Sequence, residues 1–353
     1  MTDLFTLPNV LAGLIVVALN GYVLLGGADF GGGVWDLLAS GPRRDSQRAL
    51  IAEAIGPIWE ANHVWLIIVI VLLFTCFPPA FAALSITLHI PLTLMLIGIV
   101  LRGSAFTFRA HHGENSAMPL YWGRVFAIAS AATPVFLGIC LGAVASGDVP
   151  RMDRADFYGG FIAPWLTPFC LAVGALTLTL FAFLAAVYLT VEARDMALEE
   201  DFRGRALAAA VAVFVAAGVT LAMAMWSAPV VARGLTASVW ALPLHIVTGL
   251  AALGAIGTLW VRRYRFARLA AAAQVSLILW GWALGQYPYL VLPTMTIAEA
   301  AAPPLTLTLV LWALAGGALM LFPSLAYLFR VFKRQPDRDD PARAGVTGTH
   351  ARR

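Results

Sequence analysis

Long apolar runs, separated by short polar segments, fill most of the chain. A helix needs about 20 mostly apolar residues to cross the hydrocarbon core of a bilayer, and nine stretches meet that requirement. The pattern therefore predicts an all-α, polytopic transmembrane helical bundle with about nine spans, which forms one integral membrane domain over residues 1–334. The predicted spans cover roughly 9–28, 58–77, 80–101, 123–145, 161–189, 206–226, 240–261, 267–286 and 304–332.

Two segments interrupt or end this pattern. Phe77-Pro78-Pro79 separates the second and third spans, and it predicts a tight helical hairpin because proline starts a helix but breaks its interior. Residues 335–353 carry Pro, Gly, Asp, Arg and Thr without apolar periodicity, which predicts a disordered tail.

The basic residues orient the predicted spans. Of the 23 Lys and Arg residues, only Arg151, Arg154 and Arg233 fall in segments on one side, and the other 20 fall on the opposite side. Cytoplasmic loops are the ones enriched in Lys and Arg. We therefore expect the N-terminus outside and the C-terminus in the cytoplasm.

Composition agrees with a membrane protein and narrows the classes of function. The chain is 61% hydrophobic and 12% charged, with a mean hydropathy of +0.84. Soluble domains are roughly 45–50% apolar and about 25% charged, so a soluble enzyme, a disordered chain and a nucleic-acid binder are excluded. The three cysteines, Cys76, Cys140 and Cys170, lie in apolar stretches without the close spacing of a metal site, so no metal is expected.

Asp29 is the first ionisable residue within the predicted membrane region. It lies in Gly26-Gly27-Ala28-Asp29-Phe30-Gly31-Gly32-Gly33, whose glycines permit close helix packing or an unwound backbone. Two interpretations stay open: an interfacial aspartate at a helix end, or a carboxylate held in a tight polar site.

A second polar group begins the second span. If Pro57 starts or kinks the helix, Glu60 lies about one turn inside it and His63 follows on the same face. Glu53 shares that face if the helix is continuous. With Asn62, these residues predict either a proton path or a structural hydrogen-bonded cluster, and a haem or metal ligand at His63 is a further alternative.

Arg102 and Arg109 lie seven positions apart near the end of the third span. They either extend to phosphate headgroups or pair with Glu60 or Asp29, because buried charges are normally paired.

Three motifs together resemble subunit II of the cytochrome bd-type quinol oxidases. The first is Gly27-Ala28-Asp29-Phe30-Gly31, which resembles the family's glycine-and-aspartate end of helix one. The second is Ile55 to Leu66, including Trp59, Glu60 and Asn62, which is similar to Gly-Pro-x-Trp-Asp-Gly-Asn-x-Val-Trp-Leu. The third is Leu101 to Arg109, similar to Arg-Gly-x-x-Phe-x-x-Arg, and a weaker resemblance covers 287–304.

This resemblance implies a haem-free, multi-pass subunit of the bacterial inner membrane that pairs with oxidase subunit I. Subunit I would carry haem b, haem d and the quinol site, and the complex would reduce oxygen to water with cytoplasmic protons. The resemblance further implies a proton channel lined by the carboxylate at Glu60, with room for a structural quinone and a small accessory subunit.

The chain departs from the family pattern at four positions. Glu60 replaces an aspartate, Ala61 replaces a glycine, His63 stands where Glu or Gln is usual, and Gly26 replaces a second acid. A scaffold subunit without proton conduction is therefore an alternative function. A secondary transporter is a further alternative, because such proteins also carry charged residues within the membrane.

Overall fold

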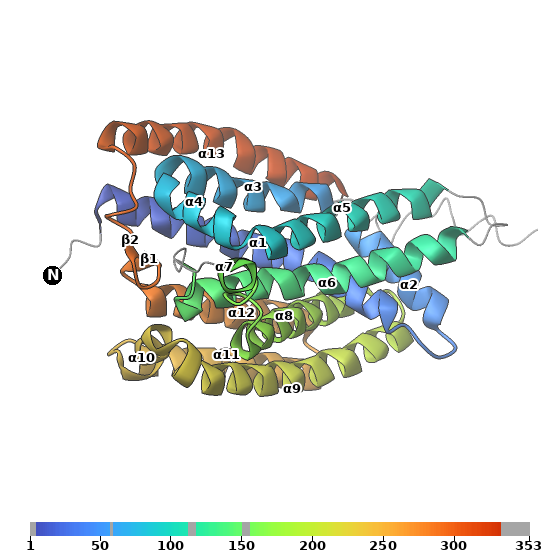
Figure 1. The fold of residues 1–353 in the computed structure, drawn as a ribbon. Helices are drawn as coiled ribbons and strands as arrows, with labels where there is room; N and C mark the ends of the chain where they lie inside the picture. The colour runs from blue at the N-terminus through green and yellow to red at the C-terminus, as the bar shows by residue number, and fades with distance from the viewer. Residues whose placement is uncertain (1–4, 57–58, 112–117, 150–155, 333–353) are drawn as a thin grey trace, which may run out of the picture. The chain divides into compact units, whose positions relative to one another are not determined.

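The computed structural model describes residues 5–56, 59–111, 118–149 and 156–332. Residues up to Leu307 form one compact unit, and the residues from Thr308 form a second unit. The described residues are almost entirely helical, in agreement with the all-α prediction, and the long helices of the first unit run alongside one another (Figure 1). The elements are α1 (Leu7–Leu37), α2 (Arg44–Ile55), α3 (Trp59–Cys76), α4 (Pro78–Thr87), α5 (His89–His111), α6 (Met118–Ser146), α7 (Phe157–Phe161), α8 (Pro168–Glu192), α9 (Met196–Ser227), α10 (Pro229–Ala237), α11 (Ala241–Trp260), α12 (Tyr264–Gln286), β1 (Tyr289–Val291), β2 (Met295–Thr296) and α13 (Pro304–Phe332).

Eight helices among the described residues are long and apolar enough to cross a membrane, and the number is nine if α2 and α3 count as one bent span. The predicted number of spans is therefore confirmed within this range. The bend between α2 and α3 is 53°. The predicted hairpin at Phe77-Pro78 is also present, because α3 ends at Cys76 and α4 begins at Pro78.

Several segments that were expected to be loops are instead helical. α1 continues through the glycine segment to Leu37, well beyond the expected end near 28. α9 begins at Met196, about two and a half turns before the expected start at 206. The loops near 39–57 and 227–239 contain α2 and α10, while the expected fifth span is divided into α7 and α8. The predicted disordered tail at 335–353 lies outside the described residues.

The segment between α12 and α13 contains the antiparallel pair β1 and β2, which the hydropathy pattern did not predict. Thr296 donates two hydrogen bonds to Glu299 Oε2, from its amide at 2.9 Å and from its hydroxyl at 2.8 Å. These bonds favour the ionised carboxylate and hold the pKa of Glu299 below its ordinary value. Further along, the amide of Ala302 donates to the carbonyl of Cys76 at 2.8 Å, which ties this segment to the end of α3.

α1 is the helix around which the first unit is built. It packs against α3, α6 and α8, and its glycines face these neighbours. A Cβ added at Gly31 would lie 1.9 Å from the carbonyl oxygen of Phe181, and one at Gly33 would lie 2.2 Å from the Cβ of Ser130. The glycine segment therefore serves close packing of a continuous helix, not an unwound backbone.

We predict that Gly31→Ala destabilises the protein, because the methyl group overlaps the backbone of α8. Overpacking of this kind typically costs about 1–3 kcal/mol, and more where backbone must move. Gly13→Ala is the matched control on the same helix, since nothing lies within 4 Å of a Cβ added there. Thermal unfolding of the purified protein in detergent measures both variants. Equal melting temperatures for Gly31→Ala and Gly13→Ala would contradict the close contact.

Candidate functional site

Asp29 lies inside the helical bundle. Its side chain is 6% exposed, and it accepts a hydrogen bond of 2.5 Å between its Oδ2 and Asn62 Nδ2. Asn62 is also buried, and it projects from α3. The burial fits a carboxylate held in a tight polar site, because α1 continues for two further turns and neighbouring helices cover the carboxylate.

Arg102 brings a positive charge to the same region from α5. The side chain is 2% exposed, and its guanidinium lies 4.7 Å from the ring centre of Phe30 and 5.5 Å from that of Phe126. The Asp29 carboxylate attracts this charge. Two of its nitrogens, Nε and Nη2, make no hydrogen bond to any described residue. Cation–π contacts and the nearby carboxylate thus compensate for the lost solvation.

The position of Arg102 rules out the interpretation in which its side chain extends to lipid headgroups. Electrostatic pairing with Asp29 is the arrangement that the structure supports. Arg109 lies in α5, but its side chain is outside the described part of the structure, as is that of Trp59.

Tyr22 and His63 complete a buried polar cluster, which we define as Tyr22, Asp29, Asn62, His63 and Arg102. The Tyr22 and His63 rings lie 5.9 Å apart, and Tyr22 is 1% exposed. His63 also contacts the ring of Phe30, with 6.2 Å between the ring centres. Sequence reasoning missed Tyr22, because a tyrosine in an apolar span gives no signal of its own. Its position seven residues before Asp29, on the same helix face, is the signal that was available.

Glu60 and Glu53 are not aligned along one helix face. Glu60 lies in the first turn of α3 and is exposed. Glu53 belongs to α2, where its Oε1 accepts a hydrogen bond of 2.6 Å from Arg194, and both side chains are mostly exposed. A shared face for both residues required a continuous helix, and this condition is not met because the chain bends by 53° between α2 and α3.

Asp36 is a second buried acid of α1 that sequence reasoning missed. It is 1% exposed, and Arg48 of α2 approaches its Oδ1 to 3.8 Å. It was missed because the first span was expected to end before it. Its position seven residues after Asp29 places both acids on one face of the helix.

A surface network fixes α2 against α9. Arg43 donates to both carboxylate oxygens of Asp201, at 2.8 and 2.5 Å, and this pairing raises the pKa of Arg43. Gln47 donates to the same carboxylate at 2.9 Å, and its own Oε1 accepts a bond of 2.7 Å from Arg205. The network fixes the position of α2. It therefore also fixes Arg48 of α2, which lies near Asp36.

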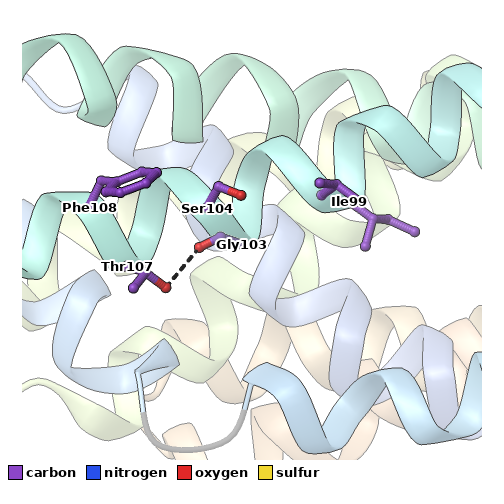
Figure 2. A pocket seen from close by; sticks show the side chains of 6 residues that line it. Ile99, Gly103, Ser104, Thr107 and Phe108 are labelled. Atoms are coloured by element: carbon purple, nitrogen blue, oxygen red, sulfur yellow. Dashed lines mark hydrogen bonds between the residues drawn. The ribbon is translucent and has the colours of Figure 1, made fainter.

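A shallow pocket of about 410 Å³ lies on α5, away from the buried polar cluster. Figure 2 shows the side chains that line it, with the Thr107 hydroxyl donating to the carbonyl of Gly103 at 3.1 Å. Arg102 projects from the opposite side of the helix, since the lining residues follow a separate stripe. The pocket is lined by Ile99, Val100, Gly103, Ser104, Thr107 and Phe108.

No group of three His, Cys, Asp or Glu side chains among the described residues is placed to hold a metal ion. The cysteines Cys76, Cys140 and Cys170 are buried and free. The site is a set of buried polar and ionisable side chains in a polytopic helical membrane protein.

Comparison with known proteins identifies the family. Residues 7–332 match the family model for cytochrome bd terminal oxidase subunit II. Cytochrome bd-I ubiquinol oxidase subunit 2 of Escherichia coli is 28% identical over 179 residues, which is 50% of this chain and 46% of that protein. A putative cytochrome bd menaquinol oxidase subunit II of Bacillus subtilis is 20% identical over 342 residues, covering 94% of this chain and 96% of its own length.

The structure of bd oxidase from Geobacillus thermodenitrificans has the same fold, with a TM-score of 0.76 and 23% identity over 93% of this chain and 99% of the matched chain. The Escherichia coli match spans about half the length of that relative. Fold and site thus define a multi-pass helical membrane subunit with buried ionisable groups. The chain belongs to the cytochrome bd terminal oxidase subunit II family.

We predict that Arg102 and Asp29 are energetically coupled. Arg102→Leu leaves Asp29 as an uncompensated buried charge, which typically costs about 3–5 kcal/mol. Asp29→Asn in the same chain removes that charge, so the double variant is expected to be more stable than the sum of the two single losses, by about 0.5–3 kcal/mol. Melting temperatures of the four proteins of the cycle measure the coupling.

Arg44→Leu is the control for the cycle, because Arg44 is exposed at the start of α2 and its loss is expected to change stability by less than about 0.5 kcal/mol. A double variant whose loss equals the sum of the single losses would show that the two residues act independently.

Proposed function

We propose that this chain is the haem-free subunit II of a quinol oxidase, that it supports subunit I, and that it provides a proton path from the cytoplasm through Glu60 and Asp29. The observation that carries the proposal is the buried carboxylate of Asp29, bonded to Asn62 and placed near the Arg102 charge. A buried charge is costly and has to be compensated, so its retention inside a membrane helix favours a function in charge or proton movement.

The arrangement of side chains supports a path that begins at Glu60. Glu60 is exposed at the start of α3, where it can exchange protons with water. His63 lies about one turn further along the same helix face. Asn62 lies within that turn and bonds directly to Asp29. The path therefore runs along the first turns of α3 and reaches α1 at Asp29, with Glu53 outside it.

The orientation follows from the distribution of basic residues. The split of 3 against 20 supports a cytoplasmic C-terminus and an external N-terminus. In this orientation α2 and the start of α3 lie at the cytoplasmic side, so Glu60 faces the compartment from which an oxidase takes protons.

The pocket on α5 supports the partnership with subunit I. Gly103, Ser104 and Thr107 are small, and small residues at such spacing let a second transmembrane helix approach closely. We propose that a helix of subunit I packs there. Subunit I would hold haem b, haem d and the site that oxidises quinol, in the bacterial inner membrane. We also propose that the complex has room for a structural quinone and for a small accessory subunit.

Membership of an oxidase complex is tested by purifying the chain through an affinity tag and recording a reduced-minus-oxidised visible spectrum. We expect b-type and d-type haem signals and a co-purifying subunit I. A haem-free assembly with an unrelated partner would contradict the proposal and favour a secondary transporter.

The proton path is tested with Glu60→Ala in the assembled complex. We expect oxygen-consuming turnover or voltage generation to fall about tenfold or more, since a positioned proton-transfer group typically contributes 10²–10⁴-fold. Glu60→Asp keeps the carboxylate and is expected to retain most of the activity. Glu53→Gln is the control, because Glu53 pairs with Arg194 at the surface.

Unchanged turnover and voltage in Glu60→Ala, at normal haem content, would remove the proton path. The chain would then be a scaffold subunit without proton conduction.

A further inference from the structure

Asp36 is a buried carboxylate that is not part of the proposed path from Glu60 to Asp29. It lies two helical turns beyond Asp29, near the end of α1, and 1% of its side chain is exposed. Asp29, Gly33 and Asp36 occupy positions i, i+4 and i+7, so they lie on one stripe of the helix. Two acids on one stripe, both buried, are a costly arrangement in a membrane protein.

Arg48 connects Asp36 with water. Its Nε and Nη2 donate to the backbone carbonyl of Asp36 at 3.4 and 3.3 Å, and its Nε lies 3.8 Å from Asp36 Oδ1. The Arg48 side chain is 20% exposed. The carboxylate is thus buried, while the charge that compensates it reaches the surface of the protein.

A buried hydroxyl lies between the two acids. Gly33 has no side chain, and Ser130 of α6 occupies the space beside it, so that an added Cβ would lie 2.4 Å from Ser130 Oγ. Ser130 is fully buried, and its Oγ has no hydrogen-bond partner among the described residues. An unsatisfied buried hydroxyl destabilises the fold, so its presence at this position calls for a function.

We propose that Asp36, Ser130 and Asp29 form a proton relay along α1, in which Asp36 takes up the proton near the surface and Asp29 receives it inside the bundle. This inference rests on the proposed function, because it assumes that Asp29 accepts protons. It adds a second entry to the proton path, separate from Glu60, which converges with the first at Asp29.

The geometry allows the transfer. Seven residues of helix span about 10.5 Å. One hydroxyl and about two water molecules would join the two carboxyl groups through about four hydrogen bonds of roughly 2.8 Å each. In each transfer protonated Asp36 loses its proton toward Ser130, the Ser130 hydroxyl passes its own proton toward Asp29, and Ser130 is left unchanged.

The charged groups near the relay suit this direction. Arg48 faces Asp36 from α2, and Arg102 is near Asp29 from α5, so each carboxylate has one guanidinium to stabilise its ionised form. Asn62 of α3 donates to Asp29, and the Tyr22 ring of α1 lies in the same cluster. Each acid of the relay therefore lies near a positive charge.

A purely structural interpretation assigns Asp36 and Arg48 to holding α2 against the end of α1. The two interpretations differ in what they predict for Ser130, which belongs to α6 and has no part in holding α2 by the Asp36–Arg48 contact. They also differ for Asp36→Asn, which preserves the shape of the side chain and removes its ability to carry a proton.

The experiment compares variants of the complete complex with subunit I, after adjusting for haem content. The variants are Asp36→Asn, Asp36→Glu and Ser130→Ala, with Asp45→Asn as the matched control at an exposed acid of α2. The readouts are the rate of voltage generation after an oxygen pulse and its ratio in H₂O and D₂O. Each variant is compared in the Glu60→Ala chain, where Asp36 is the remaining entry. There we expect Asp36→Asn to slow the residual rate about tenfold, Ser130→Ala to slow it about threefold, and Asp36→Glu to restore most of it. The solvent isotope ratio should rise in the slow variants, which a loss of packing would not cause.

Asp29→Asn separates failure of the relay from failure of the proposed function. If Asp29→Asn is slow while Asp36→Asn and Ser130→Ala match Asp45→Asn, the relay is overturned and the path from Glu60 stands. If Asp29→Asn and Glu60→Ala also match the control, the proposed proton path and the relay both fall. If Asp36→Asn does not assemble, Ser130→Ala decides: slowing supports the relay, and an unchanged rate overturns it.

Discussion

The backbones of α1 and α8 meet at Gly31, where no side chain fits between them, and the surroundings of α1 depend on this contact. Because the glycines of α1 let α6 and α8 approach closely, the middle of this helix is shielded on several sides. Trp35 strengthens the same contact by donating its indole N–H to the carbonyl of Ala182 at 2.7 Å. A polar site at Asp29 can exist only because the packing around it excludes lipid, since lipid offers a carboxylate no hydrogen bonds.

The buried polar cluster follows from that exclusion. Asp29 obtains a donor from α3 and a positive charge from α5, so three helices that are distant in sequence supply one site. Phe30 and Phe126 hold the guanidinium of Arg102 between their rings, which orders the charge without neutralising it. A site built from such weakly neutralised charges responds strongly to one added proton, because low polarity around it screens little.

The sequence predicted the features that depend on local chemistry. It did not predict the features that depend on contacts between distant parts of the chain. Hydropathy identified the spans, and Pro78 identified the turn between α3 and α4, because the bilayer and the proline ring act on nearby residues alone. The polar start of α9 was missed because Asp201 and its neighbours look like a loop until Arg43 and Gln47 are placed opposite them. Glu53 would share the face of Glu60 only in a continuous helix, and the bend between α2 and α3 separates the two residues. Its partner Arg194 comes from a remote part of the chain, which the sequence alone does not reveal. The resemblance located Asp29, Asn62 and Arg102, but their mutual arrangement required coordinates.

The hydrogen bond from Ala302 to the carbonyl of Cys76 has a consequence for the biogenesis of the protein. Membrane helices are inserted as the ribosome delivers them, so α3 and α4 enter the bilayer long before Ala302 is synthesised. Pro78 has no amide hydrogen, and the carbonyls at the end of α3 are among those that a helix leaves unpaired. The end of α3 is therefore completed only when the segment before α13 folds back onto it. The carbonyl of Cys76 therefore receives this hydrogen bond only after most of the chain has been translated.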